Sequence, residues 1–395
     1  MDQAELRELL TPEGLALLDS LPAWESSTDV VRTVAALRKA GHSPGLVAAV
    51  MGQARLRARA SSKFGPFAAT MLFTEAGLEQ ATRLSVAALH AGRFQRAGIG
   101  WVADLGCGIG ADALALAALD IEVTAVERDE VTAAIAAYNL ASWSNARVEH
   151  GDAESADLSG VGGVYLDPAR RDGARRLADP ADWSPSLDFA FGLAERLPTG
   201  VKLGPGIDRD LIPAEAEAQW VSVDREVVEL GVWFGTLARP GVRRSALVVG
   251  EHGTAELVAA ADSDDEPAGS LGEYLYEPDG AVIRARLIGD LARSLGGRML
   301  DPTIAYVTAD TATATPFAAC FRVVEDFPLD KKVLKKEVAA RGIGTLEIKK
   351  RGVDIDPAAF RTAFRTALAP KGAASGTLIL TRMGERRRAL LVERV

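Results

Sequence analysis

Glycines and acidic residues cluster near position 100 in a pattern that could bind a small polar ligand. Gly106, Gly108 and Gly110 lie in Asp104-Leu-Gly-Cys-Gly-Ile-Gly110, between a β-branched run and an Ala-rich run. Glycines let a backbone turn sharply and approach a ligand without side chains in the way. We therefore predict a binding loop at the carboxyl end of a strand, where sheets of this kind bind ligands.

Three carboxylates extend this pattern. Asp104 stands two residues before Gly106, and Glu127 ends the next predicted strand, 21 residues beyond that glycine, where an acid can accept hydrogen bonds from ribose hydroxyls. Asp152, followed by Ala153, comes after the third predicted strand and could accept from an adenine amino group. Taken alone, Asp152 is more simply a turn residue, Glu127 a helix-capping acid, and the glycines a tight turn. Together, in this order, they indicate a nucleoside site.

Asp104 decides between two kinds of nucleoside cofactor. Gly106-x-Gly108-x-x-Ala111 also satisfies the dinucleotide fingerprint when its last position is relaxed to Ala, so a nicotinamide-dependent oxidoreductase is a rival. A carboxylate at position 104 would repel a pyrophosphate, but it would hold an ammonium by a charge-assisted hydrogen bond. We therefore predict S-adenosylmethionine, whose sulfonium is also cationic, as the cofactor.

A second constellation follows the fourth predicted strand. Asp167 and Pro168 continue into Ala169, Arg170 and Arg171. The proline fixes its own φ and restricts Asp167, which leaves carbonyl and carboxylate oxygens as acceptors. Such acceptors can orient an amino group for methyl transfer, and proximity supplies much of the rate. We predict Asp167, Pro168 and Arg170 as the reaction site, with no metal and no covalent nucleophile. An ordinary loop opening is the alternative for an isolated Asp-Pro pair.

The elements that position these residues alternate between strands and helices, which is typical of an α/β fold with a doubly wound parallel sheet. The expected strands are 101–105, 122–127, 147–150, 163–166, 200–203, 221–229 and 245–249, and the expected helices are 111–119, 130–141, 184–196 and 209–218. This pattern predicts a seven-stranded Rossmann-like core.

The flanking regions differ from this core. Residues 1–62 have helical spacing broken by Gly41 and Pro44, and they predict a helical N-terminal domain ahead of a core at 63–260. The acidic run 261–267 predicts a linker. A small α+β domain is expected at 268–395, with helices at 281–296, 331–340 and 357–368 and strands at 304–307, 320–324, 346–350, 376–381 and 388–393.

Charge and cysteine content narrow the functional classes. The net charge is −9, yet residues 331–395 contain 16 Lys and Arg against 6 Asp and Glu. A basic tail on an acidic body suits a module that holds a polyanion, and an ordinary solvated face is the alternative. Two cysteines, Cys107 and Cys320, argue against disulfides and a cysteine-rich zinc site. No run approaches a membrane span, and we expect a cytoplasmic protein.

With these residues in view, the central region resembles class I S-adenosylmethionine-dependent methyltransferases, in particular the RNA guanine-N2 branch that includes trimethylguanosine synthases. Residues 63–65 and 71–81 resemble the segment that those enzymes place over the cofactor, which adds Phe73 and Thr74 to the implied cofactor site. The whole chain resembles the bacterial THUMP-like-domain methyltransferases, and residues 346–357 carry that likeness in the tail.

The resemblance implies methyl transfer to a base nitrogen of a structured RNA such as tRNA or rRNA, with guanine N2 as one candidate. The related enzymes usually follow Asp-Pro-Pro with an aromatic residue that stacks on the base, whereas this chain has Ala169 and Arg170. Trp183, Phe73 or the guanidinium of Arg170 are the candidates for the missing stacking surface. Two further alternatives stay open: a noncatalytic RNA-binding scaffold with a vestigial cofactor site, and methylation of a small molecule or protein.

Overall fold

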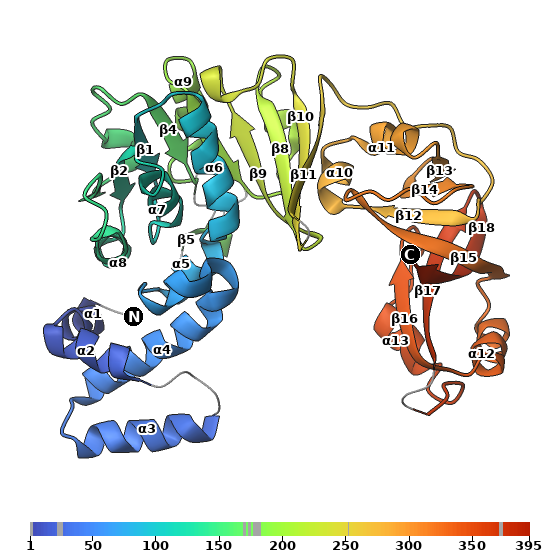
Figure 1. The fold of residues 1–395 in the computed structure, drawn as a ribbon, viewed down its shortest axis with the longest axis horizontal. Helices are drawn as coiled ribbons and strands as arrows, with labels where there is room; N and C mark the ends of the chain where they lie inside the picture. Colours follow the sequence, from blue (N-terminus) through green and yellow to red (C-terminus); the bar gives the residue numbers. More distant parts are fainter. Residues whose placement is uncertain are drawn as a thin grey trace. The chain divides into compact units, whose positions relative to one another are not determined.

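The structure is a computed structural model that describes residues 3–21, 27–168, 171–172, 175–176, 183–251, 253–370 and 374–395. The chain forms two compact units. The first comprises Met1–Leu203 and Trp233–Ala238, and the second comprises Gly204–Val232 and Arg239–Val395 (Figure 1). The domain boundaries predicted at 62 and 260 do not coincide with this division and stay predictions.

Helices make up the start of the first unit, as the spacing of apolar residues predicts. They are α1 (Gln3–Leu9), α2 (Pro12–Ser20), α3 (Ser27–Lys39), α4 (Pro44–Phe64), α5 (Glu75–Gln80) and α6 (Leu84–Arg96). Ser43 caps the start of α4: its hydroxyl accepts a hydrogen bond from the N–H of Leu46, and Pro44 occupies the first turn of the helix. Phe64 and eight other α4 residues are buried, so this helix anchors the helical segment to the core.

A parallel sheet forms the core of the first unit. Its strands are β1 (Trp101–Leu105), β2 (Glu122–Glu127), β3 (Ala146–His150), β4 (Gly163–Leu166) and β7 (Thr199–Leu203), in the order β7-β4-β1-β2-β3. The connecting helices include α7 (Ala111–Ala117), α8 (Glu130–Leu140) and α9 (Leu187–Ala194). The alternation of strands and helices predicted for residues 101–203 is confirmed, and it brings the ends of β1, β2 and β4 to one edge.

The second unit corrects two expectations. Its first strands are β8 (Glu217–Val223), β9 (Glu226–Trp233), β10 (Arg244–Gly250) and β11 (Gly253–Ala259). The helix expected at 209–218 is wrong, because only a 3₁₀ turn at Arg209–Leu211 precedes β8. The single strand expected at 221–229 is two strands, since Asp224 and Arg225 both have positive φ, 49° and 70°. Two consecutive positive φ values form a tight hairpin, which a strand pattern alone does not reveal.

A second sheet follows in the C-terminal region. Its strands are β12 (Tyr274–Pro278), β13 (Arg298–Asp301), β14 (Ile304–Ala309), β15 (Ala318–Pro328), β16 (Ile343–Lys350), β17 (Ala374–Met383) and β18 (Arg386–Arg394), in the order β13-β14-β12-β15-β18-β17-β16. The α+β character is as predicted. The one helix expected at 281–296 is instead α10 (Gly280–Arg284) and α11 (Ile288–Ser294), with Arg286 at φ 60° between them.

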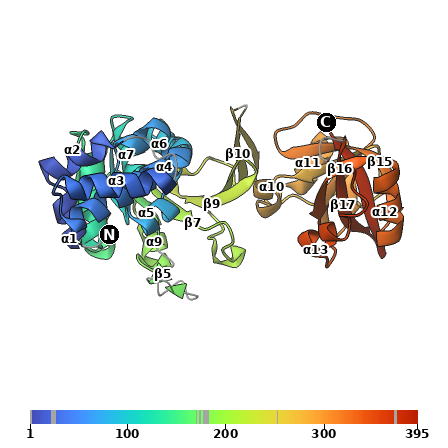
Figure 2. The same ribbon diagram turned by 90° about the horizontal axis from the view of Figure 1, so that it is seen from below.

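Helices α12 (Lys331–Ala340) and α13 (Pro357–Thr362) lie beside β16 and β17 (Figure 2). Alternate residues of β17 serve two cores: Leu378 and Leu380 pack in the cluster that contains Leu334 and Phe360, whereas Ile379 packs with Tyr306 on the other side. Both faces of β17 are therefore buried, which explains why its residues 378–381 are all apolar or small and uncharged.

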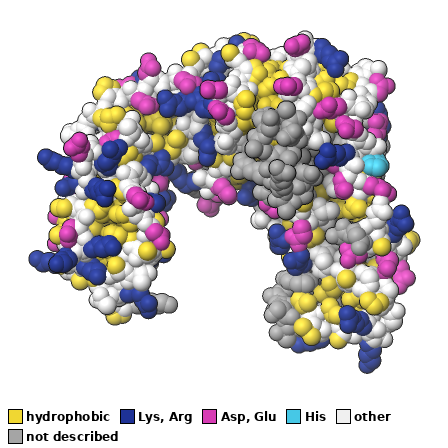
Figure 3. Space-filling view, turned by 180° about the vertical axis from the view of Figure 1, so that it is seen from behind, with side chains coloured by type: hydrophobic (Ala, Val, Ile, Leu, Met, Phe, Trp, Pro, Cys, Tyr) yellow, Lys and Arg dark blue, Asp and Glu magenta, His cyan; other side chains and the backbone are white. Residues whose placement is uncertain are grey.

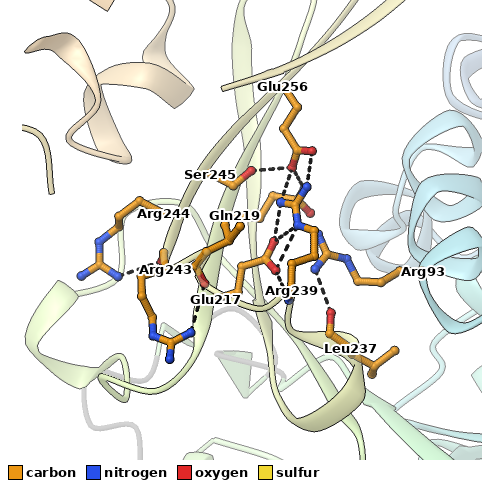
Figure 4. Close-up of polar contacts among 10 residues, drawn as sticks. Arg93, Glu217, Gln219, Leu237, Arg239, Arg243, Arg244, Ser245 and Glu256 are labelled. Atoms are coloured by element: carbon orange, nitrogen blue, oxygen red, sulfur yellow. Dashed lines mark hydrogen bonds and ion pairs between the residues drawn. The ribbon is translucent and has the colours of Figure 1, made fainter. Parts of the chain in front are cut away.

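A polar cluster stiffens the strands β8, β10 and β11 (Figure 4). The guanidinium of Arg239 bonds both Glu217 and Glu256, with contacts of 2.6 and 2.5 Å, and Ser245 donates to Glu256 at 2.6 Å. Glu217 is fully buried, so its charge depends on this pairing. Each oxygen of the two carboxylates has a partner within the chain, which identifies the cluster as structural. Among the described helices, none is long and apolar enough to cross a membrane.

Candidate active site

The glycine loop has the backbone that its sequence predicts. Gly106, Gly108 and Gly110 have φ of 86°, 56° and 86°, a region that favours glycine. The N–H groups of Gly106 and Cys107 both donate to the carbonyl of Val126, at 2.9 and 3.0 Å, which ties the loop to the end of β2. A Cβ atom added to Gly108 would meet no atom within 4 Å, so the loop is open on that side.

Asp104 lies at the end of β1 with 1% of its surface exposed. Its Oδ2 atom is buried and has no hydrogen-bond partner within the described structure. Burial raises the pKa of the Asp104 carboxyl well above its usual value, and the charges of Asp112 and Asp167 raise it further, while Lys202 opposes the rise. A buried carboxylate oxygen without a partner is costly, and a cationic ligand would relieve that cost.

Glu127 ends β2 beside the loop and is partly exposed. Its Oε2 accepts from the N–H of Gly108 at 3.0 Å, and its Oε1 accepts from the N–H of Asp129 at 2.9 Å. A carboxylate has about four acceptor positions, so two remain for a ligand. The side chain thus orders the loop and keeps the capacity to accept from ribose hydroxyls.

Asp152 is exposed, and its Oδ1 accepts from the N–H of Glu154 at 2.8 Å. It caps the 3₁₀ turn Ala153–Ser155, the simpler explanation weighed for this residue, while Ala153 is buried. The carboxylate of Asp152 keeps further acceptor positions, and its contact with adenine stays a prediction.

The segment before α5 is held in place by two buried amides. Gln53 donates to the carbonyl of Phe73 at 2.7 Å and accepts from its N–H at 3.0 Å. Asn139 forms the same pair of bonds with Leu72 and also donates to the carbonyl of Ile109 in the glycine loop at 2.9 Å. The segment is therefore fixed to the glycine loop, and its place over the cofactor stays a prediction.

Within this segment the two implied cofactor residues differ. The ring of Phe73 is fully buried and packs against Phe64, with ring centroids 5.5 Å apart, so it presents no face for stacking in this structure. The hydroxyl of Thr74 caps α5 by accepting from the N–H of Gly77 at 2.9 Å. A Cβ atom on Gly77 would lie 2.5 Å from the side chain of Ile109, so α5 packs directly on the glycine loop. Trp183, the other proposed stacking ring, is also buried.

The reaction loop lies against the glycine loop. The carbonyl oxygen of Asp167 is 3.4 Å from the position of a Cβ on Gly106, and Pro168 is buried. Ala169 and Arg170 lie outside the described residues, so the predicted role of Arg170 rests on the sequence. Asp167 follows β4, and Asp104 lies in the neighbouring strand β1, so the structure brings the two predicted sites together.

Sequence reasoning missed Lys202. This lysine of β7 has 8% of its surface exposed, and its Nζ lies 2.5 Å from Oδ2 of Asp167. The same ammonium donates to the hydroxyl of Thr82 at 3.0 Å and to the carbonyl of Gln80 at 3.4 Å. A lone lysine in the otherwise uncharged strand 199–203 was the signal that could have drawn attention to it.

Behind Lys202 a polar chain continues into the core. Thr82 donates to Oδ2 of Asp112 at 2.6 Å, Oδ1 of Asp112 is 3.1 Å from Nδ1 of His90, and the hydroxyl of Tyr165 is 2.9 Å from the same nitrogen. Burial works to raise the pKa of Asp112, but the bond to His90, the charge of Lys202 and the Thr82 hydroxyl together hold it below its usual value. Asp112 is therefore an ionised, buried anchor.

Cys107 has no sign of nucleophilic activation. Burial raises the pKa of its thiol well above the usual value, and the charges of Asp104 and Glu127 raise it further. A thiol that stays protonated is a poor nucleophile, so Cys107 is given no role in the chemistry.

The fold and the site define a Rossmann-like methyltransferase, and known proteins agree. An uncharacterized S-adenosylmethionine-dependent methyltransferase of Mycobacterium tuberculosis, found in strains CDC 1551 and H37Rv, is 32% identical over 343 residues, which cover 83% of this chain and 91% of the relative. The chain belongs to this family of S-adenosylmethionine-dependent methyltransferases. The predicted cofactor is confirmed, and the nicotinamide-dependent and noncatalytic alternatives are set aside.

Two further comparisons concern parts of the chain and its fold. A solved methyltransferase structure from Porphyromonas gingivalis W83 covers 97% of this chain and 98% of its own length, with a TM-score of 0.74 and 23% identity. This likeness confirms the predicted fold class. Residues 318–394 match the family described as THUMP domain-like, as the resemblance in the tail predicts, and residues 2–60 match a domain of unknown function.

The residues of the glycine loop fit S-adenosylmethionine. The unpartnered oxygen of Asp104 can take up a cationic group, the open side of Gly108 leaves room beside the backbone, and Glu127 has acceptor capacity for hydroxyls. S-adenosylmethionine supplies a methyl group bound to a positively charged sulfur.

Proposed function

We propose that this methyltransferase acts on a nitrogen atom of a base in a structured RNA, with the guanine 2-amino group as the first candidate. Asp104, Gly106, Gly108, Gly110 and Glu127 bind the cofactor, with Thr74, Asp152 and Ala153 at its edges. Asp167 and the backbone of Pro168 accept hydrogen bonds from the amino group, and Arg170 contacts the base or its phosphate.

The position of Asp167 supports nitrogen as the acceptor atom. Its carboxylate and carbonyl are acceptors that can bind the N–H groups of an amine, and they lie beside the glycine loop. Bound in this way, the amine directs its lone pair away from Asp167 and toward the methyl donor. A hydroxyl acceptor would instead require a base that removes its proton before or during attack.

The observation that carries the RNA part is the set of unpaired cations in the C-terminal region. Some cations of this region have acidic partners: Arg341 pairs with Glu325 and Glu337, and Arg388 pairs with Asp326. Seven other exposed cations form neither an ion pair nor a cation–π contact with any described residue: Lys332, Lys336, Lys350, Arg361, Arg365, Arg386 and Arg387. Figure 3 shows Lys and Arg side chains along the surface of this region, on the left of the view.

Unpaired cations on a folded surface suit the phosphates of a nucleic acid. The same region matches the THUMP domain-like family, whose RNA-binding character the resemblance implies. It contains few exposed aromatic rings, which favours recognition of phosphates and shape over stacking on single-stranded bases.

The test is transfer from radiolabelled S-adenosylmethionine to bulk RNA isolated from cells that lack the gene. We expect label in the tRNA or rRNA fraction, and mass spectrometry of the digested nucleosides then identifies the methylated atom. Asp167→Ala serves as the inactive control. Label that enters only protein or small molecules would overturn the proposal.

A further inference from the structure

The four residues before α5 form neither a helix nor a strand, so their backbone groups need partners from elsewhere. Helix α4 supplies several of them. Arg57 donates to the carbonyl of Met71 at 2.9 Å. Gln53, one turn earlier on α4 and fully buried, bonds both backbone groups of Phe73. Phe64, the last residue of α4, packs its ring on that of Phe73. These side chains thus hold the segment as a neighbouring strand would.

The contact with α4 continues along α5, which lies beside it (Figure 1). Glu75 in the first turn of α5 pairs with Arg55 and Arg59, which stand one turn apart on α4. Lys63 then donates to three carbonyls at the end of α5, those of Leu78, Glu79 and Ala81, at 2.8, 2.8 and 3.0 Å. Carbonyls at a helix end lack partners within the helix, and the ammonium satisfies them. Residues 71–81 are therefore bound to α4 from one end to the other.

The same segment is joined to the glycine loop. Asn139 bonds both backbone groups of Leu72 and also donates to the carbonyl of Ile109, which stands between two glycines of the loop. A Cβ atom on Gly77 of α5 would lie 2.5 Å from the side chain of Ile109, so α5 and the loop are in direct contact. A displacement of the segment would therefore move the backbone of the loop.

We propose that α4 is a functional part of the cofactor site: Gln53, Arg57 and Lys63 position residues 71–81 against the glycine loop and thereby set the affinity for S-adenosylmethionine. The three are positioning residues, because they act through the segment and need not touch the cofactor. The proposal gives a role to the N-terminal region, of which residues 2–60 match a domain of unknown function. It rests on the proposed assignment of the cofactor to the glycine loop and is independent of the RNA substrate.

The physical reason is preorganisation. A loop that is already held in its binding conformation loses little conformational entropy when the ligand binds, whereas a loop without that support must be ordered at the expense of affinity. The coupling is reciprocal, because a ligand that binds better when α4 holds the segment must in turn strengthen the contacts of α4. Both directions of this coupling can be measured.

The first measurement is calorimetric titration of full-length variants with S-adenosylmethionine. Gln53→Met keeps the length of the side chain and removes its hydrogen bonds with Phe73, and it should weaken binding about tenfold. Lys63→Met should weaken binding about fivefold, whereas Lys63→Arg keeps the donors and should stay within about twofold of wild type. Wild-type affinity in Gln53→Met would overturn the proposal. Equal losses in the two Lys63 variants would overturn the role of that lysine.

A matched control separates positioning from general stability. Leu46 is buried in the first turn of α4, and a Cβ atom on the preceding Gly45 would lie 2.7 Å from Glu8 of α1, so this end of α4 packs within the helical region. Leu46→Ala should destabilise the protein at least as much as Gln53→Met but leave the affinity within about twofold at a temperature where both are folded. Equal weakening in the two variants would assign the effect to stability and overturn the proposal.

Hydrogen exchange of the wild-type protein needs no variant. Because the coupling is reciprocal, S-adenosylhomocysteine should slow amide exchange about threefold or more at residues 53–64 of α4 as well as at 71–81, and it should leave α3 unchanged. Slowing that is confined to the glycine loop would contradict the proposal.

The failure of this inference can be told apart from that of the proposed cofactor site by comparison with Glu127→Ala. Normal cofactor binding by both Glu127→Ala and Gln53→Met would refute the site together with the inference. Weak binding by Glu127→Ala and normal binding by Gln53→Met would refute the inference alone.

Discussion

At the scale of single residues, Asp104 combines a structural cost with a binding role. Its buried Oδ2 has no partner, and the raised pKa of its carboxyl reflects the cost of ionising it in the folded protein. When the pKa of a carboxyl is higher in the folded state than in the unfolded state, the protein loses stability as the pH rises through the folded-state pKa. At a pH where Asp104 is ionised and can bind a cation, the ligand-free protein is therefore less stable than it is at lower pH.

The first prediction is that Asp104→Asn stabilises the ligand-free protein at neutral pH by about 1–2 kcal/mol, because it removes a buried group that is costly to ionise. The gain should shrink toward acid pH, where the wild-type carboxyl is protonated. Urea unfolding between pH 4 and pH 8 measures it, and Asp354→Asn, an exposed carboxyl, is the control. The same variant should bind S-adenosylmethionine at least tenfold more weakly; a variant that binds normally would contradict the role of Asp104.

The second prediction separates cofactor binding from transfer. Asp167→Ala should abolish methyl transfer and leave the affinity for S-adenosylhomocysteine within about threefold of wild type, because Asp167 faces the acceptor and the product is neutral. Glu127→Ala should mainly weaken cofactor binding, by tenfold or more, since it loses both the ribose acceptors and the bond to Gly108. Calorimetry and single-turnover assays distinguish the two effects, and the reverse pattern would refute the assignment.

At the scale of elements, side chains from distant segments hold the strands and loops in register. The side-chain amides of Gln53 in α4 and Asn139 in α8 form hydrogen bonds with the backbone groups of residues 73 and 72, as a neighbouring strand would. These bonds fix the segment before α5 against the glycine loop. In the second unit Arg239 also joins separate strands, because it neutralises the buried Glu217 of β8 and links it to Glu256 of β11.

The third prediction concerns this last pair. Arg239→Met should destabilise the protein by about 2–3 kcal/mol, because the buried carboxylate of Glu217 loses the guanidinium charge and keeps the backbone N–H of residue 239 as a donor. Arg239 is partly exposed, so the loss is smaller than for a fully buried pair. Restoring neutrality with Glu217→Gln in the Arg239→Met background should recover part of the loss. Chemical denaturation measures both, and a loss that persists in full in the double variant would show that packing, not charge, is responsible.

At the scale of the whole molecule, an acidic methyltransferase core is joined to a region with a surplus of unpaired cations. The total charge of −9 hides this contrast, because the surplus lies in the last 65 residues. Within that region Glu337 pairs with Arg341 and Glu393 pairs with Arg322, whereas exposed cations such as Arg386 and Arg387 stay available to phosphates.

The fourth prediction follows from those cations. Arg386→Gln with Arg387→Gln should weaken binding to tRNA about tenfold at 0.1 M salt and reduce the slope of log affinity against log salt by about 1.5, since two phosphate contacts are lost. The matched control is Arg38→Gln with Lys39→Gln, an adjacent exposed pair in α3. Filter binding across a salt series measures both slopes. An equal loss in the two pairs would mean that net charge, and not this surface, attracts RNA.

The sequence by itself determined the features that depend on short stretches of chain. Glycines at 106, 108 and 110 specify the loop, carboxylates at strand ends specify where a cationic nucleoside can bind, and the alternation of β-branched and Ala-rich runs specifies a Rossmann-like core, because backbone preferences and side-chain period act over a few residues. The basic tail was likewise visible as composition.

Only the tertiary structure decided which distant residues meet. It pairs Lys202 with Asp167 across 35 positions and anchors that lysine through Thr82 and Asp112, contacts that depend on the order of strands in the sheet. It also buries Phe73 against Phe64, and it turns the apolar run at 221–229 into a hairpin through positive φ at Asp224 and Arg225. Burial and charge pairing are properties of neighbours in space, and a linear pattern does not contain them.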